Sequence, residues 1–135
     1  MGGFGKDPIP GWGPTEPEKE PAPALRPETA HLRALNGPCA GREFPLNALR
    51  LILGRNDPPL LTVDIDLTDC EMGSPPKISR RHAEIRWADD ALQIVDLGSL
   101  NGTWIDNTRL PPSEPTSLAV GSRLRLANLE FEVAA

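Results

Sequence analysis

The 135-residue sequence contains no tyrosine, only two methionines and two cysteines, and aromatic residues make up 4% of it. With so few rings available, leucine, isoleucine and valine must fill the core. The two cysteines, Cys39 and Cys70, lack the C-x-x-C spacing of metal and redox motifs, so we expect no metal site. We also expect both to be reduced thiols, as is usual in the cytoplasm.

Long apolar runs are also absent. No stretch approaches the ~20 residues that span a bilayer. The first residues, "MGGFGKDPIPGWG", lack the apolar core of a signal peptide. The net charge of -5 does not favour a phosphate backbone as ligand. We therefore expect a cytoplasmic monomer with no cofactor and no membrane or nucleic-acid partner.

Proline and glycine, in contrast, are abundant and unevenly spread. Residues 1–28 hold seven of the sixteen prolines and five of the twelve glycines, with little to bury. This composition predicts a disordered arm. Trp12 stands out in the arm, either as a contact point or as a solvated ring without a role. Residues 29–135 have room for one domain.

The domain shows the patterns of short strands. "HLRALN", "REFPL" and "LRLILGR" are apolar-rich runs separated by turn signals, and "HAEIRW" alternates with the period of two of a half-buried strand. "ADD" indicates a turn into "ALQIVDL", and Ala127-Asn128 indicates a tight hairpin. No segment has helical periodicity. We predict an all-β sandwich of two antiparallel or mixed sheets.

Three polar clusters lie at the ends of these runs: Gly54-Arg55, Ser79 to His82, and Asn101 to Thr103. Each also has a simpler explanation. Asn-Gly is a strong hairpin-turn signal, Arg55 could be a surface charge, and Arg80 with Arg81 could form a solvated face. A hydrolase triad of Ser79, His82 and Asp96 lacks a nucleophile elbow and an oxyanion device. We therefore do not expect an enzyme.

Taken together, the clusters are more specific. "ISRRHAEI" and "DLGSLNGTWID", with Gly-Arg about twenty-five residues before the first of them, resemble the forkhead-associated (FHA) domain over roughly residues 30–133. The likeness is to the small bacterial FHA proteins. The resemblance implies eleven strands in two sheets. It also implies that loops at one end bind a phosphothreonine in a partner's peptide, as an adaptor or regulatory module in Ser/Thr kinase signalling.

The resemblance assigns roles to individual residues. Phosphothreonine binding falls to Arg55, Ser79, Arg80 and Asn101. Structural support of the site falls to Gly54, His82, Gly102 and Thr103. The chemistry agrees, because a guanidinium fork matches phosphate oxygens and an Asn amide can both donate to and accept from a peptide backbone.

Two departures from the family pattern concern the rim of the site. Leu100 stands where the family often has Ser or Thr, with Ser99 one place earlier. "DLTDCEMGSPPK" is a long acidic connection that could weaken phosphopeptide affinity.

Lys77, two residues before Ser79, is expected to favour an acidic residue three positions after the phosphothreonine. A phosphate-independent structural subunit with the same fold is the alternative function.

The arm adds a second possible ligand. Some small bacterial members of the family bind a phosphorylated threonine of their own N-terminal arm. Their Glu-Thr-Thr run is absent here, yet "PTEPE" places Thr15 three residues before Glu18. Thr15 is therefore a candidate phosphorylation site, and the chain's own arm a candidate partner; otherwise Thr15 is an unmodified linker residue. Thr29 is another possible target.

Overall fold

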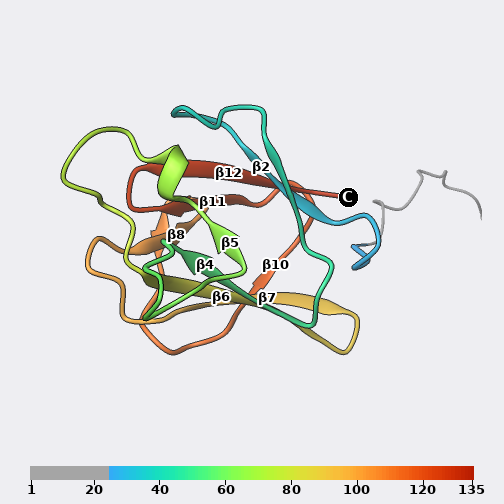
Figure 1. Ribbon diagram of the computed structural model, residues 1–135. Helices are drawn as coiled ribbons and strands as arrows, with labels where there is room; N and C mark the ends of the chain where they lie inside the picture. Colours follow the sequence, from blue (N-terminus) through green and yellow to red (C-terminus); the bar gives the residue numbers. More distant parts are fainter. Residues whose placement is uncertain (1–24) are drawn as a thin grey trace, which may run out of the picture.

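The computed structural model describes residues 25–135, which form two stacked β-sheets (Figure 1). The five-stranded sheet has the order β10-β7-β6-β4-β5 and the six-stranded sheet the order β3-β2-β12-β11-β8-β9. The first sheet contains β4 (Arg50–Gly54), β5 (Ile65–Asp66), β6 (Arg81–Ala88), β7 (Ala91–Asp96) and β10 (Thr116–Leu118). The second contains β2 (His31–Ala34), β3 (Glu43–Pro45), β8 (Thr103–Ile105), β9 (Thr108–Arg109), β11 (Arg123–Leu126) and β12 (Leu129–Ala134). The predicted all-β sandwich is confirmed; β4–β5 is a parallel pair, so one sheet is mixed.

Two predicted turns lie where the strand patterns place them. β6 and β7 are antiparallel and meet at the Ala88–Ala91 pair, so Asp89-Asp90 makes the turn, with Asp89 at a φ of 58°. β11 and β12 meet at the Leu126–Leu129 pair, which leaves Ala127-Asn128 as the hairpin turn. Aliphatic side chains dominate the core between the sheets, and Phe131 is the largest fully buried one. Leucine, isoleucine and valine thus fill most of the core, as the shortage of aromatic residues led us to expect.

The sandwich has two distinct ends. The segment leading into β6, the end of β4 and the connection from β7 to β8 lie at one end, on the left in Figure 1. The β6–β7 turn, the start of the described chain and the labelled C-terminus lie at the other, on the right. The strand register also places the two chain ends together, because Ala134 of β12 pairs with His31 at the start of β2. Both described chain ends therefore lie away from the loops that carry the polar clusters.

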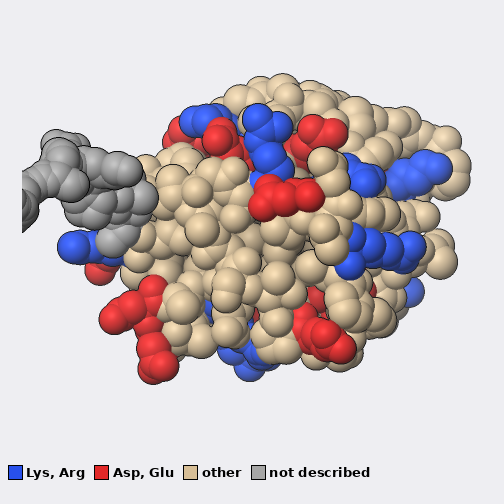
Figure 2. Space-filling view, turned by 180° about the vertical axis from the view of Figure 1, so that it is seen from behind, with Lys and Arg blue, Asp and Glu red and all other residues tan. Residues whose placement is uncertain are grey.

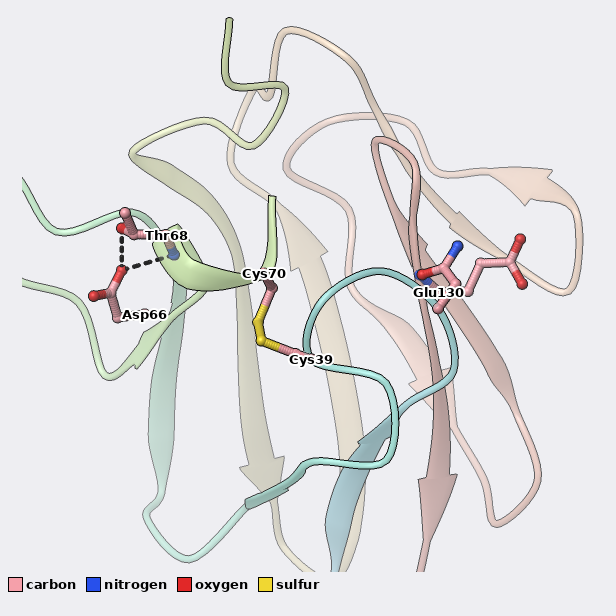
Figure 3. Close-up of a disulfide and its surroundings, with 6 residues drawn as sticks. Cys39, Asp66, Thr68, Cys70 and Glu130 are labelled. Atoms are coloured by element: carbon pink, nitrogen blue, oxygen red, sulfur yellow. Dashed lines mark hydrogen bonds between the residues drawn. A yellow bond between two sulfur atoms is a disulfide. The ribbon is translucent and has the colours of Figure 1, made fainter. Parts of the chain in front are cut away.

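The prediction of two reduced thiols was wrong. Cys39 and Cys70 form a disulfide with their Cα atoms 5.0 Å apart, as Figure 3 shows. Cys39 lies between β2 and β3, and Cys70 ends a short 3₁₀ turn, η2 (Thr68–Cys70), that follows β5. The bond therefore ties the two sheets together. Spacing alone could not reveal it, because the two residues are 31 positions apart in sequence and meet only in the folded sandwich.

Asp66 fastens the start of η2 in the same region (Figure 3). Its carboxylate accepts hydrogen bonds from the Thr68 hydroxyl at 2.6 Å and the Thr68 N–H at 3.1 Å. It also accepts one from the Asn56 N–H at 3.1 Å. Burial would raise the pKa of Asp66, but these hydrogen bonds and the charge of Arg55 together lower it. Asp66 thus joins the chain after β4 to the turn that carries Cys70.

Leu25, within the expected arm, is partly buried and packs against the core. The rest of the arm, including Trp12 and Thr15, lies outside the described residues. Within residues 25–135, no helix is long and apolar enough to cross a membrane, and no cluster of metal-ligating side chains is found. On the face seen in Figure 2, charges of both signs surround a largely uncharged centre.

Candidate functional site

The three polar clusters meet at a hollow at one end of the sandwich. Its lining includes Arg55, Lys77, Ser79, Arg80, Leu100 and Asn101. These side chains come from three connections: the one after β4, the one before β6 and the one between β7 and β8. The residues that the sequence singles out for phosphate binding and for specificity are therefore neighbours in space.

Gly54 allows the first two connections to touch. A Cβ atom at this position would lie 2.0 Å from the Arg80 carbonyl oxygen and 2.9 Å from that of Ser79. The ladder between β4 and β6 also shifts here, because Leu53 pairs with Ala83 while Gly54 pairs with Arg81. His82 is the extra residue of this bulge, and bulges commonly re-aim a side chain. Position 54 therefore requires glycine, because the backbone of Ser79 and Arg80 leaves no room for a side chain.

Arg55, the next residue in the chain, bonds to the same loop before β6. Its backbone N–H donates to the Arg80 carbonyl at 3.1 Å, and its Nε donates to the Ile78 carbonyl at 2.5 Å. The side chain remains 27% exposed. One edge of the guanidinium therefore braces the loop before β6, while the group still lines the hollow.

His82 joins two of the loops from inside the protein. It is fully buried; its Nδ1 accepts the Ser79 N–H at 3.1 Å, and its Nε2 lies 2.8 Å from the Gly102 carbonyl oxygen. Since Nδ1 accepts, Nε2 must carry the proton and donate, which is the arrangement of a neutral imidazole. Burial lowers the pKa of His82, in keeping with this neutral form.

The hydrogen bonds of His82 also differ from those of a serine–histidine–aspartate triad. Both ring nitrogens of His82 are engaged by backbone groups, so neither is available to activate the Ser79 hydroxyl. The Ser79 Oγ instead accepts the Leu100 N–H at 3.1 Å. Asp96 bonds to Ser99 and Thr103. The described residues hold no serine–histidine–aspartate relay at this place.

Asp96 organises the connection between β7 and β8. It accepts hydrogen bonds from the Ser99 hydroxyl at 2.5 Å, the Thr103 hydroxyl at 2.7 Å and the Gly98 N–H at 3.0 Å. Burial would raise the pKa of Asp96, but these hydrogen bonds lower it overall. Ser99 is turned toward Asp96 and so does not replace the missing hydroxyl at position 100.

Asn101 and Gly102 do not form the hairpin that their sequence suggests. β7 and β8 belong to different sheets, so this connection crosses the sandwich. Gly102 has a φ of +90°, and a Cβ atom there would lie 2.6 Å from the Trp104 ring. Asn101 Nδ2 donates to the Lys77 carbonyl at 2.8 Å, while Leu100 is 84% exposed at the rim.

Sequence reasoning missed two carboxylates that contact the loops and side chains of the site. Glu71 accepts the Ile78 N–H at 2.9 Å and the Lys77 N–H at 3.1 Å, and its Oε2 lies 3.8 Å from Arg55 Nε. Asp57 accepts a hydrogen bond from Arg80 at 2.8 Å. For Glu71, the acidic character of the loop before Ser79 was the only signal in the sequence, and it pointed to repulsion of the ligand rather than to support of the loop.

We expect His82→Ala to lower the free energy of unfolding by about 2–4 kcal/mol, because it leaves a cavity and two unpaired buried groups. Urea unfolding at pH 7.5 measures this. A variant as stable as the parent would mean that His82 does not brace the two loops.

The stability of the parent should also fall between pH 7.5 and 5.5. The His82 pKa is lower in the folded than in the unfolded protein, so the unfolded chain takes up the proton first as the pH drops below ~6.5. The loss is at most about 1.4 kcal/mol per pH unit for one proton. The lowered pKa values of Asp66 and Asp96 act at more acidic pH, below about 4. Unfolding of His82→Ala should depend less on pH in this window.

Comparison with known proteins gives consistent matches. The family model of the FHA domain matches residues 51–127. The chain is 32% identical over 107 residues to the glycogen accumulation regulator GarA of Mycobacterium tuberculosis, covering 79% of this chain and 58% of that protein. It is 39% identical over 95 residues to the oxoglutarate dehydrogenase inhibitor of Corynebacterium diphtheriae, covering 70% and 57%.

A solved structure agrees with these matches. It comes from a structural and functional analysis of phosphothreonine-dependent FHA domain interactions, with a TM-score of 0.60 and 31% identity over 78% of this chain and 95% of that one. The chain spans less than two thirds of the length of the two curated relatives.

Proposed function

This chain belongs to the FHA family, and from that premise we propose that it binds partner proteins phosphorylated on threonine. The observation that carries the proposal is the convergence of Arg55, Ser79, Arg80 and Asn101 on one hollow. The solved relative from a study of phosphothreonine-dependent interactions supports it. We infer that the chain acts as a binding module in Ser/Thr kinase signalling and not as an enzyme, like the regulator and the inhibitor to which it is similar.

The hollow suits the chemistry of a phosphate group. At neutral pH a phosphothreonine carries about -1.5 to -2 charges and three acceptor oxygens. In our proposal the guanidinium of Arg55 and the hydroxyl of Ser79 donate to these oxygens, and Arg80 adds a second guanidinium. The Nδ2 of Asn101 donates one hydrogen bond to the Lys77 carbonyl. Its second N–H and its carbonyl oxygen are left to bond the peptide backbone.

The direct test compares binding of two matched peptides, one with phosphothreonine and one with unmodified threonine. Fluorescence anisotropy at a fixed salt concentration gives both affinities. We expect measurable binding of the phosphorylated peptide only. Equal affinities would favour the alternative, a fold that docks a partner independently of phosphate, to which the large exposure of Leu100 at the rim lends some support.

Lys77 is proposed to set the preference for a flanking residue. It is exposed beside the hollow, its N–H is held by Glu71, and its carbonyl is held by Asn101. Its ammonium group should therefore favour Asp or Glu at the third position after the phosphothreonine. Lys77→Glu should reverse this preference on a phosphopeptide array and leave the need for phosphate intact. An unchanged apolar preference at that position would contradict the role.

The chain's own arm is a second proposed ligand, through phosphorylated Thr15. The described chain starts at the end of the sandwich opposite the hollow. Eight residues of β6 span about 26 Å, and the ten residues between Thr15 and Leu25 reach about 31 Å when extended. An arm in cis can therefore reach the hollow only when nearly straight. Thr29 bonds to Arg26 in a turn at the far end, so its position excludes binding in cis.

Location in the cytoplasm is also proposed, and the Cys39–Cys70 disulfide bears on it. Disulfides are rare in reducing compartments. The disulfide and the reduced thiols can be distinguished by alkylating the protein at the moment of cell lysis, without reductant, and measuring its mass by mass spectrometry. Two modified thiols would indicate a reduced protein in the cell, and none would place it in an oxidising environment.

A further inference from the structure

We infer that Asp57 acts as a built-in competitor of the phosphate, occupying Arg80 in the free protein and lowering the affinity of the site for its ligand. This inference rests on the proposed phosphothreonine-binding function. The Asp57 Oδ2 accepts a hydrogen bond from Arg80 Nη1 at 2.8 Å. Both side chains remain partly exposed, at 40% and 58%, so an incoming ligand can reach the pair.

The loop holds Asp57 in place. The backbones of Asp57 and Leu61 exchange two hydrogen bonds, N–H of each to the carbonyl of the other, both at 2.9 Å. Pro58 and Pro59 lie in the turn between them, and proline restricts the backbone φ. Leu61 also lines the hollow. The backbone that carries Asp57 is thus held near the hollow, two residues after Arg55 on the chain.

Asp57 differs in position from the other acidic contact of the site. Glu71 has a side chain only 9% exposed and accepts two backbone N–H groups, so it supports the loop from within. Asp57 accepts from the exposed guanidinium of Arg80. The Asp57 oxygen accepts from Nη1 of this guanidinium as a phosphate oxygen would. Asp57 accepts from Nη1 alone, so a ligand must exchange with Asp57 before it can use this donor of Arg80.

This exchange decides which ligands gain from Arg80. A single carboxylate on a peptide replaces a carboxylate already present, so it brings no additional charge to the guanidinium. A phosphate carries up to two charges and three acceptor oxygens and does bring more. The pair therefore selects for phosphate over acidic side chains, at a cost in absolute affinity.

A double-mutant cycle tests the inference with a phosphothreonine peptide and fluorescence anisotropy. We expect Asp57→Asn to bind about two- to fivefold more tightly than the parent, the range of an exposed ion pair. Arg80→Gln should bind about tenfold more weakly, because one charged hydrogen-bond donor is lost. In the Arg80→Gln background, Asp57→Asn should have no further effect, since the group for which Asp57 competes is absent.

Asp90→Asn is the matched control, because it removes one negative charge in the β6–β7 turn at the opposite end of the sandwich. Its affinity should equal that of the parent. Weaker or unchanged binding by Asp57→Asn would overturn the inference, the first by showing that Asp57 positions Arg80 for the ligand. An equal gain with and without Arg80 would also overturn it. If the parent and all the variants fail to bind the peptide, the proposed function fails as well; binding by Asp57→Asn alone would support both.

Discussion

Arg55→Ala is expected to lose phosphopeptide affinity by a factor of roughly ten to more than a hundred. Hydrogen bonds to charged groups contribute about 1.5–3 kcal/mol each, and a guanidinium can make two to one phosphate. The structure adds a second reason for a large effect. Arg55 Nε also donates to the Ile78 carbonyl, so the side chain supports the loop that presents Ser79. Titration calorimetry with one phosphothreonine peptide measures the loss.

Two further variants separate these contributions. Arg55→Lys keeps the charge but not the planar fork, so it should fall between the parent and Arg55→Ala. Arg123→Ala removes an exposed arginine from the other sheet and should bind like the parent. All three should unfold cooperatively at temperatures near that of the parent. Parent-like binding by Arg55→Ala would mean that the phosphate site lies elsewhere.

The double variant Cys39→Ala, Cys70→Ala is expected to be about 3–4 kcal/mol less stable than the oxidised parent. The disulfide closes a loop of 31 residues, and a closed loop of that size restricts the unfolded chain by about this amount. The variant should also bind phosphopeptide more weakly. Cys70 directly precedes Glu71, whose carboxylate holds the N–H groups of Lys77 and Ile78 beside the hollow.

The parent treated with a reducing agent provides the comparison. Reduced parent and double variant should unfold at similar denaturant concentrations, both below that of the oxidised parent. Glu71→Gln, which keeps the disulfide but weakens the acceptor, should lose binding with a smaller loss of stability. If oxidised and reduced parent are equally stable and bind equally well, the disulfide has neither effect.

Local sequence patterns predicted the strands and hairpins well where neighbouring elements are also paired in space. "HAEIRW" lies in β6, although the strand is not half-buried as predicted, since His82 and Glu84 are buried too. Ala127-Asn128 is the turn between β11 and β12. The same logic fails at Asn101-Gly102, because a turn signal does not reveal that the flanking strands enter different sheets. The two-residue strands β5 and β9 are too short to have a recognisable period.

The residues of the site also divide into those that local sequence patterns predict and those that they do not. Its phosphate-binding candidates were identifiable from their motifs, and the structure places them around one hollow. The acidic residues and the disulfide around these candidates were not identifiable. Glu71, Asp57 and the Cys39–Cys70 bond act across distant parts of the chain, and each depends on how the loops fold against one another. An acidic residue near a basic pocket has the same sequence signature whether it supports, competes or is solvated.

The position of both described chain ends at one pole of the sandwich has a practical consequence. Leu25 and the C-terminal strand leave the domain opposite the hollow (Figure 1). A fluorophore, affinity tag or surface linker attached after β12 would point away from the binding loops. The domain can therefore be immobilised through this end as an oriented capture reagent, with its loops presented to the solution.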